Sequence, residues 1–246
     1  MSIFNQRKRT KRTIHNDILA ENSPFTFTEA YKALRTNFNY AALNGQHKKI
    51  VVTSSIQGEG KSSVSIKLAT SLAANGAKVL LIDADMRNPS IHRYLRIKRP
   101  ANTGLSSVLV GDASLETCLF QTPQGFTVLL GGPIPPTPVE MLSSKTMEEL
   151  MDFFSDHYDY IICDAPPVGV VTDAAALSLK CDGVLFVIKQ KYATKIQVHN
   201  AIQKLESVQA NILGIVMNQY NIKEDSGKNY GYYRYRRYYY KYGDNN

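Results

Sequence analysis

The sequence predicts an α/β fold in which a mostly parallel sheet carries helices on both faces. Short apolar runs rich in β-branched residues recur along the chain, and segments with helical periodicity lie between them. The runs are almost continuously apolar, which is typical of parallel strands that are buried on both faces. The length of 246 residues is sufficient for one α/β domain with a sizeable core. Such a sheet binds its ligands beyond the carboxyl ends of its strands.

The elements follow from this alternation in chain order. A first helix is predicted over residues 28–44, because Ala30, Leu34, Phe38 and Ala41 fall on one helical face and Gly45 can end it. Further helices are predicted at residues 62–75, 146–157 and 194–208. The predicted strands are residues 50–53, 79–82, 126–130, 160–163, 183–188 and 212–217. Glycines and prolines gather within residues 122–138, which predicts a rigid loop there.

The positive charge is confined to the two ends of the chain. Lys and Arg number 29 against 21 Asp and Glu, which gives a net charge of +8. Residues 1–12 carry +5 and residues 228–246 carry +4, so the segment between them sums to −1. A basic folded body is thereby excluded, and no specific nucleic-acid partner is expected. We predict a flexible basic arm over residues 1–25, one domain over 26–220 and a mobile tyrosine-rich tail over 221–246.

Cysteine usage and hydropathy predict a cytoplasmic protein. The three cysteines show no CxxC or CxxH spacing, which disfavours a disulfide framework and a structural zinc site. The basic start is not followed by an apolar stretch, so it does not resemble a secretory signal. No apolar run approaches the ~18 residues that a membrane span needs.

The turn after the first predicted strand is nearly a phosphate-binding loop. It runs from Ser55 to Ser62 and matches GxxxxGK[ST] except that serine replaces the first glycine. Gly58 and Gly60 allow the backbone to fold with its N–H groups around an anion, and the following helix adds its positive dipole end. Lys61 and Ser62 suit phosphate and Mg²⁺. A dinucleotide fingerprint is the weaker interpretation, because a lysine does not belong at that position.

Carboxylates follow two other predicted strands. Asp83 and Asp85 come after one of them, two residues apart and therefore on one side of an extended chain. Asp164 ends another and resembles a Walker B acid, which holds Mg²⁺ through its water shell. A strand-end aspartate can also simply cap a turn or helix. Ala165 stands where many P-loop motors carry a water-activating glutamate, which disfavours fast hydrolysis and leaves Asp83 as a candidate base for another hydroxyl.

Tyrosines crowd the C-terminal tail in a pattern without a helical or strand period. Such a segment alone suggests RNA binding or self-association. Beside a nucleotide site with a spare carboxylate, it is better interpreted as a phosphoacceptor, because a phenol needs a base to accept its proton. Eight of the 15 tyrosines lie there, namely Tyr230, Tyr232, Tyr233, Tyr235, Tyr238, Tyr239, Tyr240 and Tyr242.

Taken together, these motifs make the chain resemble the bacterial tyrosine kinases of capsular and exopolysaccharide synthesis. The resemblance rests on residues 55–62 (Walker A), 81–87 (a second Walker motif), 161–167 (Walker B), 132–142 (a proline loop), 172–174 and the tyrosine cluster. It implies a P-loop NTPase fold and Mg²⁺- and ATP-dependent autophosphorylation of the tail, in trans within a homo-oligomeric ring. It also implies two partners: a transmembrane chain-length regulator whose cytoplasmic tail recruits the kinase to the inner face of the membrane, and a cognate tyrosine phosphatase.

The resemblance also implies roles for individual residues. Catalysis would involve Lys61 at the phosphates, Asp83 polarising the incoming tyrosine, Asp85 and Asp164. Asn218, after the last predicted strand, would contact adenine. Ser62, Asp85 and Asp164 would serve Mg²⁺. The implied nucleotide contacts are Gly58, Glu59, Gly60, Lys61, Ser62, Ser63 and Asn218.

The first predicted helix carries a variant of the family's oligomerisation motif. ExxRxxR reads here as Glu29, Lys32 and Arg35, which share one helical face. A lysine does not form the bidentate contacts of arginine, so the ring would be weaker or differently arranged. Glu29 has an alternative role as the capping-box partner of Thr26.

Two other functions remain as alternatives. A partitioning-type ATPase shares the fold and the nucleotide chemistry, but that group carries a signature lysine where this chain has Ile56, and it lacks a tyrosine tail. A non-enzymatic RNA-binding or scaffold protein with a Tyr/Arg tail would leave the phosphate loop and the three aspartates without a purpose.

Overall fold

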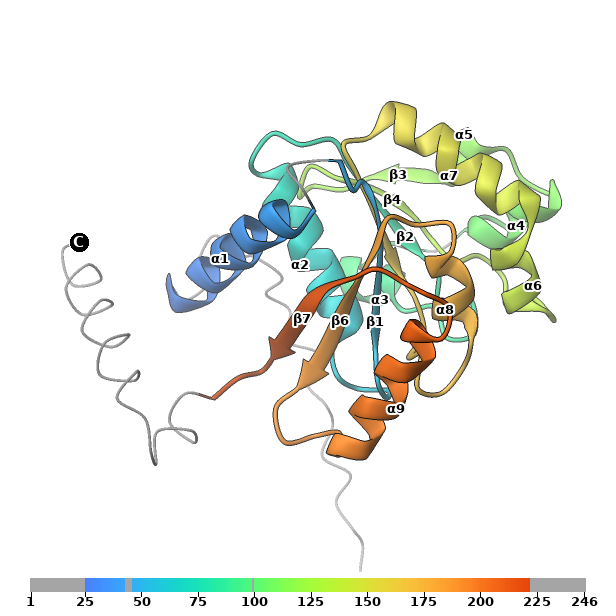
Figure 1. Cartoon of the computed structure of the whole chain (residues 1–246). Helices are drawn as coiled ribbons and strands as arrows, with labels where there is room; N and C mark the ends of the chain where they lie inside the picture. Colours follow the sequence, from blue (N-terminus) through green and yellow to red (C-terminus); the bar gives the residue numbers. More distant parts are fainter. Residues whose placement is uncertain (1–24, 43–45, 99, 222–246) are drawn as a thin grey trace, which may run out of the picture.

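A computed structural model shows a seven-stranded sheet with helices on both faces (Figure 1). It describes residues 25–42, 46–98 and 100–221, so the predicted tyrosine phosphoacceptors and nearly all of the predicted basic arm lie outside the described residues. The strand order is β3-β4-β2-β5-β1-β6-β7. The strands are β1 Lys49–Ser54, β2 Val79–Asp83, β3 Leu119–Gln121, β4 Thr127–Leu129, β5 Tyr160–Asp164, β6 Gly183–Lys189 and β7 Ile212–Asn218.

All strand pairings are parallel except that of the short edge strand β3 with β4. The central strand β1 lies between β5 and β6, and Val52 is the register partner of Asp164. The carboxyl ends of β1, β2, β5, β6 and β7 therefore lie at the same end of the sheet. The α/β class and the parallel sheet predicted from the sequence are confirmed.

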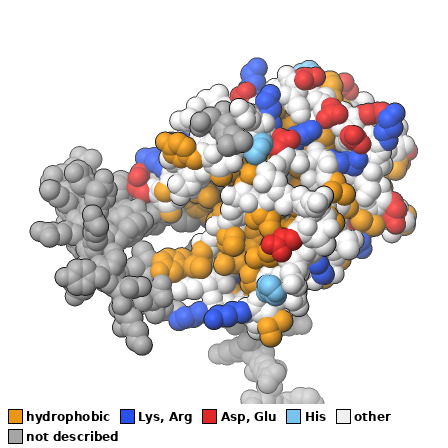
Figure 2. All heavy atoms as spheres, viewed as in Figure 1, with side chains coloured by type: hydrophobic (Ala, Val, Ile, Leu, Met, Phe, Trp, Pro, Cys, Tyr) orange, Lys and Arg blue, Asp and Glu red, His pale blue; other side chains and the backbone are white. Residues whose placement is uncertain are grey.

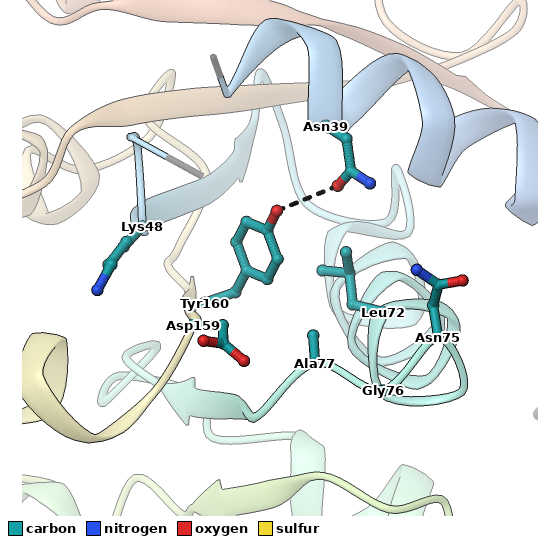
Figure 3. A pocket seen from close by; sticks show the side chains of 8 residues that line it. All are labelled: Asn39, Lys48, Leu72, Asn75, Gly76, Ala77, Asp159 and Tyr160. Atoms are coloured by element: carbon teal, nitrogen blue, oxygen red, sulfur yellow. Dashed lines mark hydrogen bonds between the residues drawn. The ribbon is translucent and has the colours of Figure 1, made fainter. Parts of the chain in front are cut away.

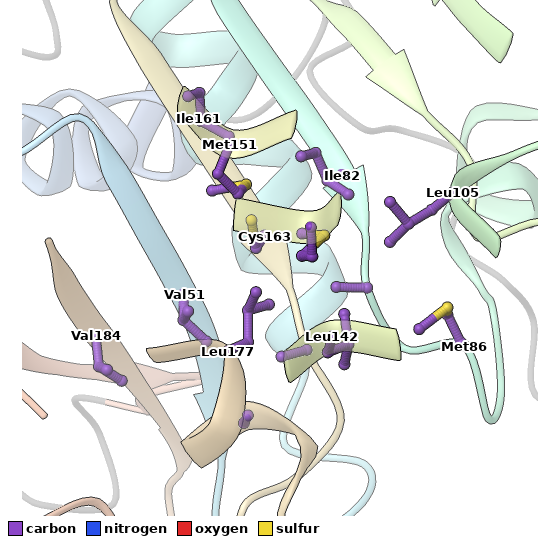
Figure 4. Close-up of a cluster of buried hydrophobic side chains, with 14 of the residues drawn as sticks. Val51, Ile82, Met86, Leu105, Leu142, Met151, Ile161, Cys163, Leu177 and Val184 are labelled. Carbon is purple, nitrogen blue, oxygen red and sulfur yellow. The ribbon is translucent and has the colours of Figure 1, made fainter. Parts of the chain in front are cut away.

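Helices cover two apolar faces of the sheet. On one face, Ile50, Val52 and Ile162 pack in a cluster with residues of α1 and α2; on the other, Val51 and Ile161 pack with residues of α6 to α9. Figure 4 shows part of the second cluster. The helices are α1 Phe25–Ala41, α2 Lys61–Ala73, α3 Ile91–Leu95, α4 Leu105–Val110, α5 Leu115–Cys118, α6 Pro138–Ser143, α7 Lys145–His157, α8 Asp173–Ser178 and α9 Lys195–Glu206.

Strand β7 is the edge strand on the side of the sheet opposite to β3. Ile215 and Met217 on this strand are about half exposed. Figure 2 shows hydrophobic side chains gathered over this edge and beside α9. Within the described part of the chain, no helix combines the length and the apolar character that a membrane span requires.

The differences from the predicted elements concern helix ends and short elements. Helix α1 begins at Phe25 and ends at Ala41, so Thr26 lies inside it and the capping-box role for Thr26 was wrong. Strand β3, helices α3 to α6 and helix α8 were not predicted, because segments of three to six residues carry no measurable periodicity. The rigid loop predicted before Pro138 leads into α6, with Pro138 in the first turn where its missing N–H costs nothing.

Candidate nucleotide-binding and catalytic site

The phosphate loop connects the central strand β1 to helix α2. Gly58 and Gly60 have φ values of 94° and 89°, a left-handed conformation that glycine adopts without the strain of a Cβ atom. Gly60 is the N-cap of α2, and Lys61 and Ser62 occupy the first turn of that helix. Ser63 lies half-buried in the same turn. The loop thus has the geometry that the motif predicts, with the amino end of a 13-residue helix directed at the anion site.

Glu59 shapes the loop from within. Its side chain is fully buried; one carboxylate oxygen accepts hydrogen bonds from Ser55 Oγ (2.6 Å) and the Ile56 amide (2.9 Å), and the other accepts from the Lys189 amide (3.3 Å). The side chain therefore joins the loop to the end of β6 and does not face a ligand. Glu59 was predicted from the sequence to contact the nucleotide. Because both of its carboxylate oxygens are engaged within the protein, only its backbone remains available for that role.

The predicted aspartates meet beside the phosphate loop. Asp83 and Asp164 are register partners at the ends of β2 and β5, and both are fully buried. Lys61 Nζ lies 2.9 Å from Asp85 Oδ2 and 3.6 Å from Asp164 Oδ2. Ser65, one turn further along α2, donates to Asp164 Oδ1 at 3.3 Å. Residues that lie far apart in the sequence, such as Ser65 and Asp164 at a separation of 99 positions, thus form one cluster, as the parallel topology predicts.

Asp83 has one paired and one unpaired oxygen. Its Oδ2 accepts hydrogen bonds of 3.0 Å from the Ser90 and Ile91 amides, so it caps the short helix α3. Its Oδ1 is buried and has no partner among the described residues. The structural role of Asp83 as a helix cap therefore involves only Oδ2, and Oδ1 is free to accept a proton or a hydrogen bond.

Burial and mutual charge set the protonation of the cluster. Burial raises the pKa of Asp83 to about 8, and the nearby Asp164 charge adds to this effect, while the Ile91 amide opposes it. Burial likewise raises the pKa of Asp164, against the charge of Lys61. For Lys61, burial alone would lower the pKa, but Asp164 and Asp85 outweigh it and the pKa is raised. Lys61 is therefore a permanent cation that the acids hold in place.

The cluster fits a hard divalent cation with water and phosphate ligands. Asp83 Oδ1 and Asp164 Oδ2 are buried oxygens that have no hydrogen-bond partner within the described part of the chain, and a cation or its water would satisfy them. Ser62 Oγ lies 3.1 Å from Ser90 Oγ and faces the same cluster as Lys61 Nζ. No three His, Cys, Asp or Glu side chains in the described ranges form a metal site by themselves. Mg²⁺ uses one or two carboxylates and keeps several waters.

An ion pair closes the acidic side of the site. Arg87 Nε donates to Asp173 Oδ1 at 2.9 Å, and the Asp173 side chain is almost fully buried at the start of α8. The pair connects the loop after β2 to α8. The sequence motifs at residues 81–87 and 172–174 therefore contact each other, which their separate positions in the sequence do not predict.

Asn218 lies on the opposite side of the loop, at the end of β7. Its Nδ2 donates to the Glu59 carbonyl at 2.8 Å, and its Oδ1 accepts from the Gln219 amide at 2.9 Å. A Cβ atom on Gly60 would collide with the Asn218 amide, so glycine is required there for space as well as for φ. Asn218 thus lies beside the phosphate loop, and its contact with adenine remains a prediction.

The predicted oligomerisation residues make contacts within the chain. Lys32 Nζ pairs with Glu29 at 2.8 Å, and Arg35 donates to the Ser71 carbonyl near the end of α2 at 2.9 Å. Lys67 of α2 lies over the Tyr31 ring, with Nζ 5.2 Å from its centroid. Helix α1 is therefore attached to the helix that begins at the phosphate loop. A role of these residues between subunits remains a prediction.

A polar pocket of about 380 Å³ lies at the other end of the sheet (Figure 3). Lys48 and Tyr160, at the amino ends of β1 and β5, line it together with Asn75 after α2. Tyr160 Oη donates to Asn39 Oδ1 of α1 at 3.2 Å, as the dashed line shows. Because these positions precede the strands, the pocket is remote from the phosphate loop and is not part of the nucleotide site.

The fold and this site define a class of protein, the ParA-type P-loop nucleotide-binding enzymes. Residues 45–237 match the ParA family, described as "NUBPL iron-transfer P-loop NTPase". The structure is also similar to the septum site-determining protein MinD of Pyrococcus horikoshii in complex with Mg-ADP (TM-score 0.60, 25% identity, 71% of each chain).

Relatives within this class carry a more specific name. The chain is 37% identical to the tyrosine-protein kinase YwqD of Bacillus subtilis over 92% of this chain and 95% of that protein. It is 37% identical to CpsD of Streptococcus pneumoniae, covering 83% and 89%. Similar structures are the chimerical protein CapA2B2 (TM-score 0.76, 33% identity, 83% and 88%) and the kinase domain of Escherichia coli tyrosine kinase ETK (TM-score 0.73, 32% identity, 79% and 77%). The chain belongs to the bacterial tyrosine-protein kinase family.

Proposed function

We propose that this protein transfers the γ-phosphate of ATP, with Mg²⁺, to tyrosines of its own C-terminal tail. The observation that carries the proposal is the buried cluster beside the phosphate loop, where Lys61 is held by Asp85 and Asp164 and Asp83 keeps one oxygen unpaired. This cluster contains a cation for the phosphates and a spare base for a hydroxyl. A partitioning ATPase has no use for eight tail tyrosines.

In the proposed mechanism the loop amides and the α2 dipole hold the phosphates. Lys61 exchanges its carboxylate partners for phosphate oxygens and neutralises charge at the transferred group. Mg²⁺ supplies further charge neutralisation; Ser62, Asp85 and Asp164 would hold it or its waters. The tyrosine oxygen forms a bond to Pγ, the bond from Pγ to the bridging oxygen of ADP breaks, and the phenol proton passes to Asp83. A pKa of about 8 gives Asp83 a proton affinity near the working pH, as a general base requires.

Assembly and regulation follow the same proposal. The resemblance supports transfer between subunits of a ring, with α1 at the contact, and activation by the cytoplasmic tail of a transmembrane chain-length regulator. The similarity to the chimerical protein CapA2B2 is consistent with such an activator. Recruitment to the inner face of the membrane, a cognate phosphatase and control of capsule or exopolysaccharide synthesis complete the proposal.

The test of phosphotransfer is incorporation of radiolabelled γ-phosphate by the full chain with Mg²⁺ and the activator peptide. Lys61→Met should reduce incorporation by about a hundredfold or more, because a buried cation at the transferred group is lost. The matched control is Lys145→Met, which removes a lysine that is 87% exposed on α7. Equal labelling of wild type and Lys61→Met would refute the proposal.

The trans step needs a separate experiment. An active protein truncated after residue 220 is mixed with full-length Lys61→Met, which keeps its tail but is expected to be inactive. Label on the Lys61→Met chain supports transfer between subunits. Labelling of the wild type alone, with none in this mixture, would show that transfer occurs within one chain.

A further inference from the structure

A tyrosine outside the tail lies against the phosphate loop. Tyr192 is in the connection that runs from the carboxyl end of β6 to α9 (Figure 1). A Cβ atom built on Gly58 would come within 2.5 Å of the Tyr192 hydroxyl, so this hydroxyl sits directly on the loop. No motif drew attention to Tyr192, because its neighbour in space lies more than a hundred residues away in the sequence.

The connection holds the ring in a defined place. The Tyr192 amide bonds to the Lys189 carbonyl at 3.3 Å, and Lys191 between them has a left-handed φ of 54°. That conformation is uncommon for a lysine and turns the chain sharply. Lys189 Nζ lies 4.6 Å from the centroid of the Tyr192 ring, a cation–π geometry. The ring is thus supported on the protein side, while 41% of the residue remains exposed.

The positions of the charged groups determine the orientation of a bound nucleotide, and therefore which end of it reaches the Tyr192 ring. The phosphate loop follows β1, which has β5 on one side and β6 on the other. Asp83 and Asp164, with Lys61, all lie on the β2 and β5 side. A triphosphate that presents its terminal phosphate to these groups must leave the loop toward the β6 and β7 side. That is the side of Tyr192.

We propose that Tyr192 is a nucleoside-contact residue, whose ring forms the wall for the base or ribose of the bound nucleotide. Exposed aromatic rings stack on bases, and a phenol whose hydroxyl is seated on Gly58 is already oriented. Its contribution belongs to nucleotide affinity and not to phosphotransfer, since it lies in the β6–α9 connection, whereas the acidic cluster lies on the β2 and β5 side of the loop. The inference rests on the proposed nucleotide site, but not on the identity of the phosphate acceptor.

The experiment compares binding of ATP, ADP and inorganic tripolyphosphate to the full chain by calorimetry in Mg²⁺ buffer. Tyr192→Ala should weaken ATP and ADP by about tenfold, the loss expected from one base–aromatic contact, and leave tripolyphosphate unchanged. Tyr192→Phe keeps the ring and should bind all three ligands as wild type does. Tyr40→Ala is the matched control, an aromatic that is 71% exposed on α1.

Each other outcome overturns the proposal. Unchanged ATP affinity in Tyr192→Ala means that the ring makes no contact. An equal loss for ATP and tripolyphosphate means that Tyr192 only shapes the phosphate loop. A loss in Tyr192→Phe as large as in Tyr192→Ala assigns the effect to the hydroxyl and not to stacking. Because no step requires phosphotransfer, the test remains valid if the chain phosphorylates no tyrosine; a chain that binds no nucleotide at all would instead fail the proposed function.

Discussion

The two sides of the phosphate loop differ in burial and charge. On the β2 and β5 side, Asp83, Asp85, Asp164 and Lys61 are all buried, and their charges face one another. On the β6 and β7 side the loop meets the amide of Asn218 and the partly exposed ring of Tyr192. Under the proposed function, one end of a parallel sheet separates reaction chemistry, which needs a dry and strongly electrostatic site, from nucleoside binding, which must remain open to solvent.

The buried β2 and β5 side also lowers the stability of the folded state. Asp83 Oδ1 and Asp164 Oδ2 are buried and find no hydrogen-bond partner among residues 25–42, 46–98 and 100–221, which disfavours the folded state in the absence of ligand. Nucleotide and metal should therefore stabilise the fold by satisfying these atoms. Asn218 carries no such penalty, because its Nδ2 and its Oδ1 each make a hydrogen bond.

The largest effect that separates the two sides is expected from Asp83→Asn. Without its spare base, the rate constant kcat should fall by about a hundredfold, while ATP affinity stays within about twofold of wild type. Steady-state kinetics and calorimetry on the same preparations measure both quantities. The exposed residue Asp112 provides the control Asp112→Asn. A variant that loses affinity and keeps kcat would break the assignment of chemistry to the β2 and β5 side.

A smaller effect is expected from Asn218→Ala on the other side. Loss of the 2.8 Å hydrogen bond to the Glu59 carbonyl loosens the phosphate loop itself. ATP and tripolyphosphate should therefore both weaken by about fivefold, the effect of one partly buried hydrogen bond. This pattern differs from that of Tyr192→Ala, which spares tripolyphosphate. A loss confined to ATP would instead support the adenine contact that the family resemblance implies.

A further expected effect, which concerns stability and neither kinetics nor binding, is a pH dependence of the free energy of unfolding in nucleotide-free protein with EDTA. Asp83 has a pKa of about 8 when folded and an ordinary value of 3.8. Between these values the unfolded chain releases the proton and the folded chain keeps it, so the free energy of unfolding falls as pH rises. Asp83→Asn should make this fall shallower, although Asp164, whose pKa is also raised, still contributes. Urea denaturation at about pH 5 and pH 8 measures the difference; identical slopes in both proteins would contradict the burial effect.

Sequence patterns predicted the parts of the site that depend on local order. The GxxxxGK[ST]-like turn places Lys61 and Ser62 at a helix start, and strand ends place the three aspartates at one edge. Contacts between residues that are distant in the sequence could not be predicted, because no local pattern encodes them. Examples are the bond from Arg35 to Ser71 between two helices and the position of Tyr192 over Gly58. Glu59 was placed in the site, but its inward orientation depends on Lys189 of a distant strand.

We propose that the buried cluster directs phosphate to a tyrosine and not to water. The most direct measurement is mass-spectrometric mapping of phosphate on the full chain after incubation with Mg·ATP and the activator peptide, with ADP quantified in the same sample. We predict phosphotyrosine within residues 230–242, in amounts that account for the ADP formed, and none in Lys61→Met. ADP released by the wild type without any phosphotyrosine in that segment would contradict the account.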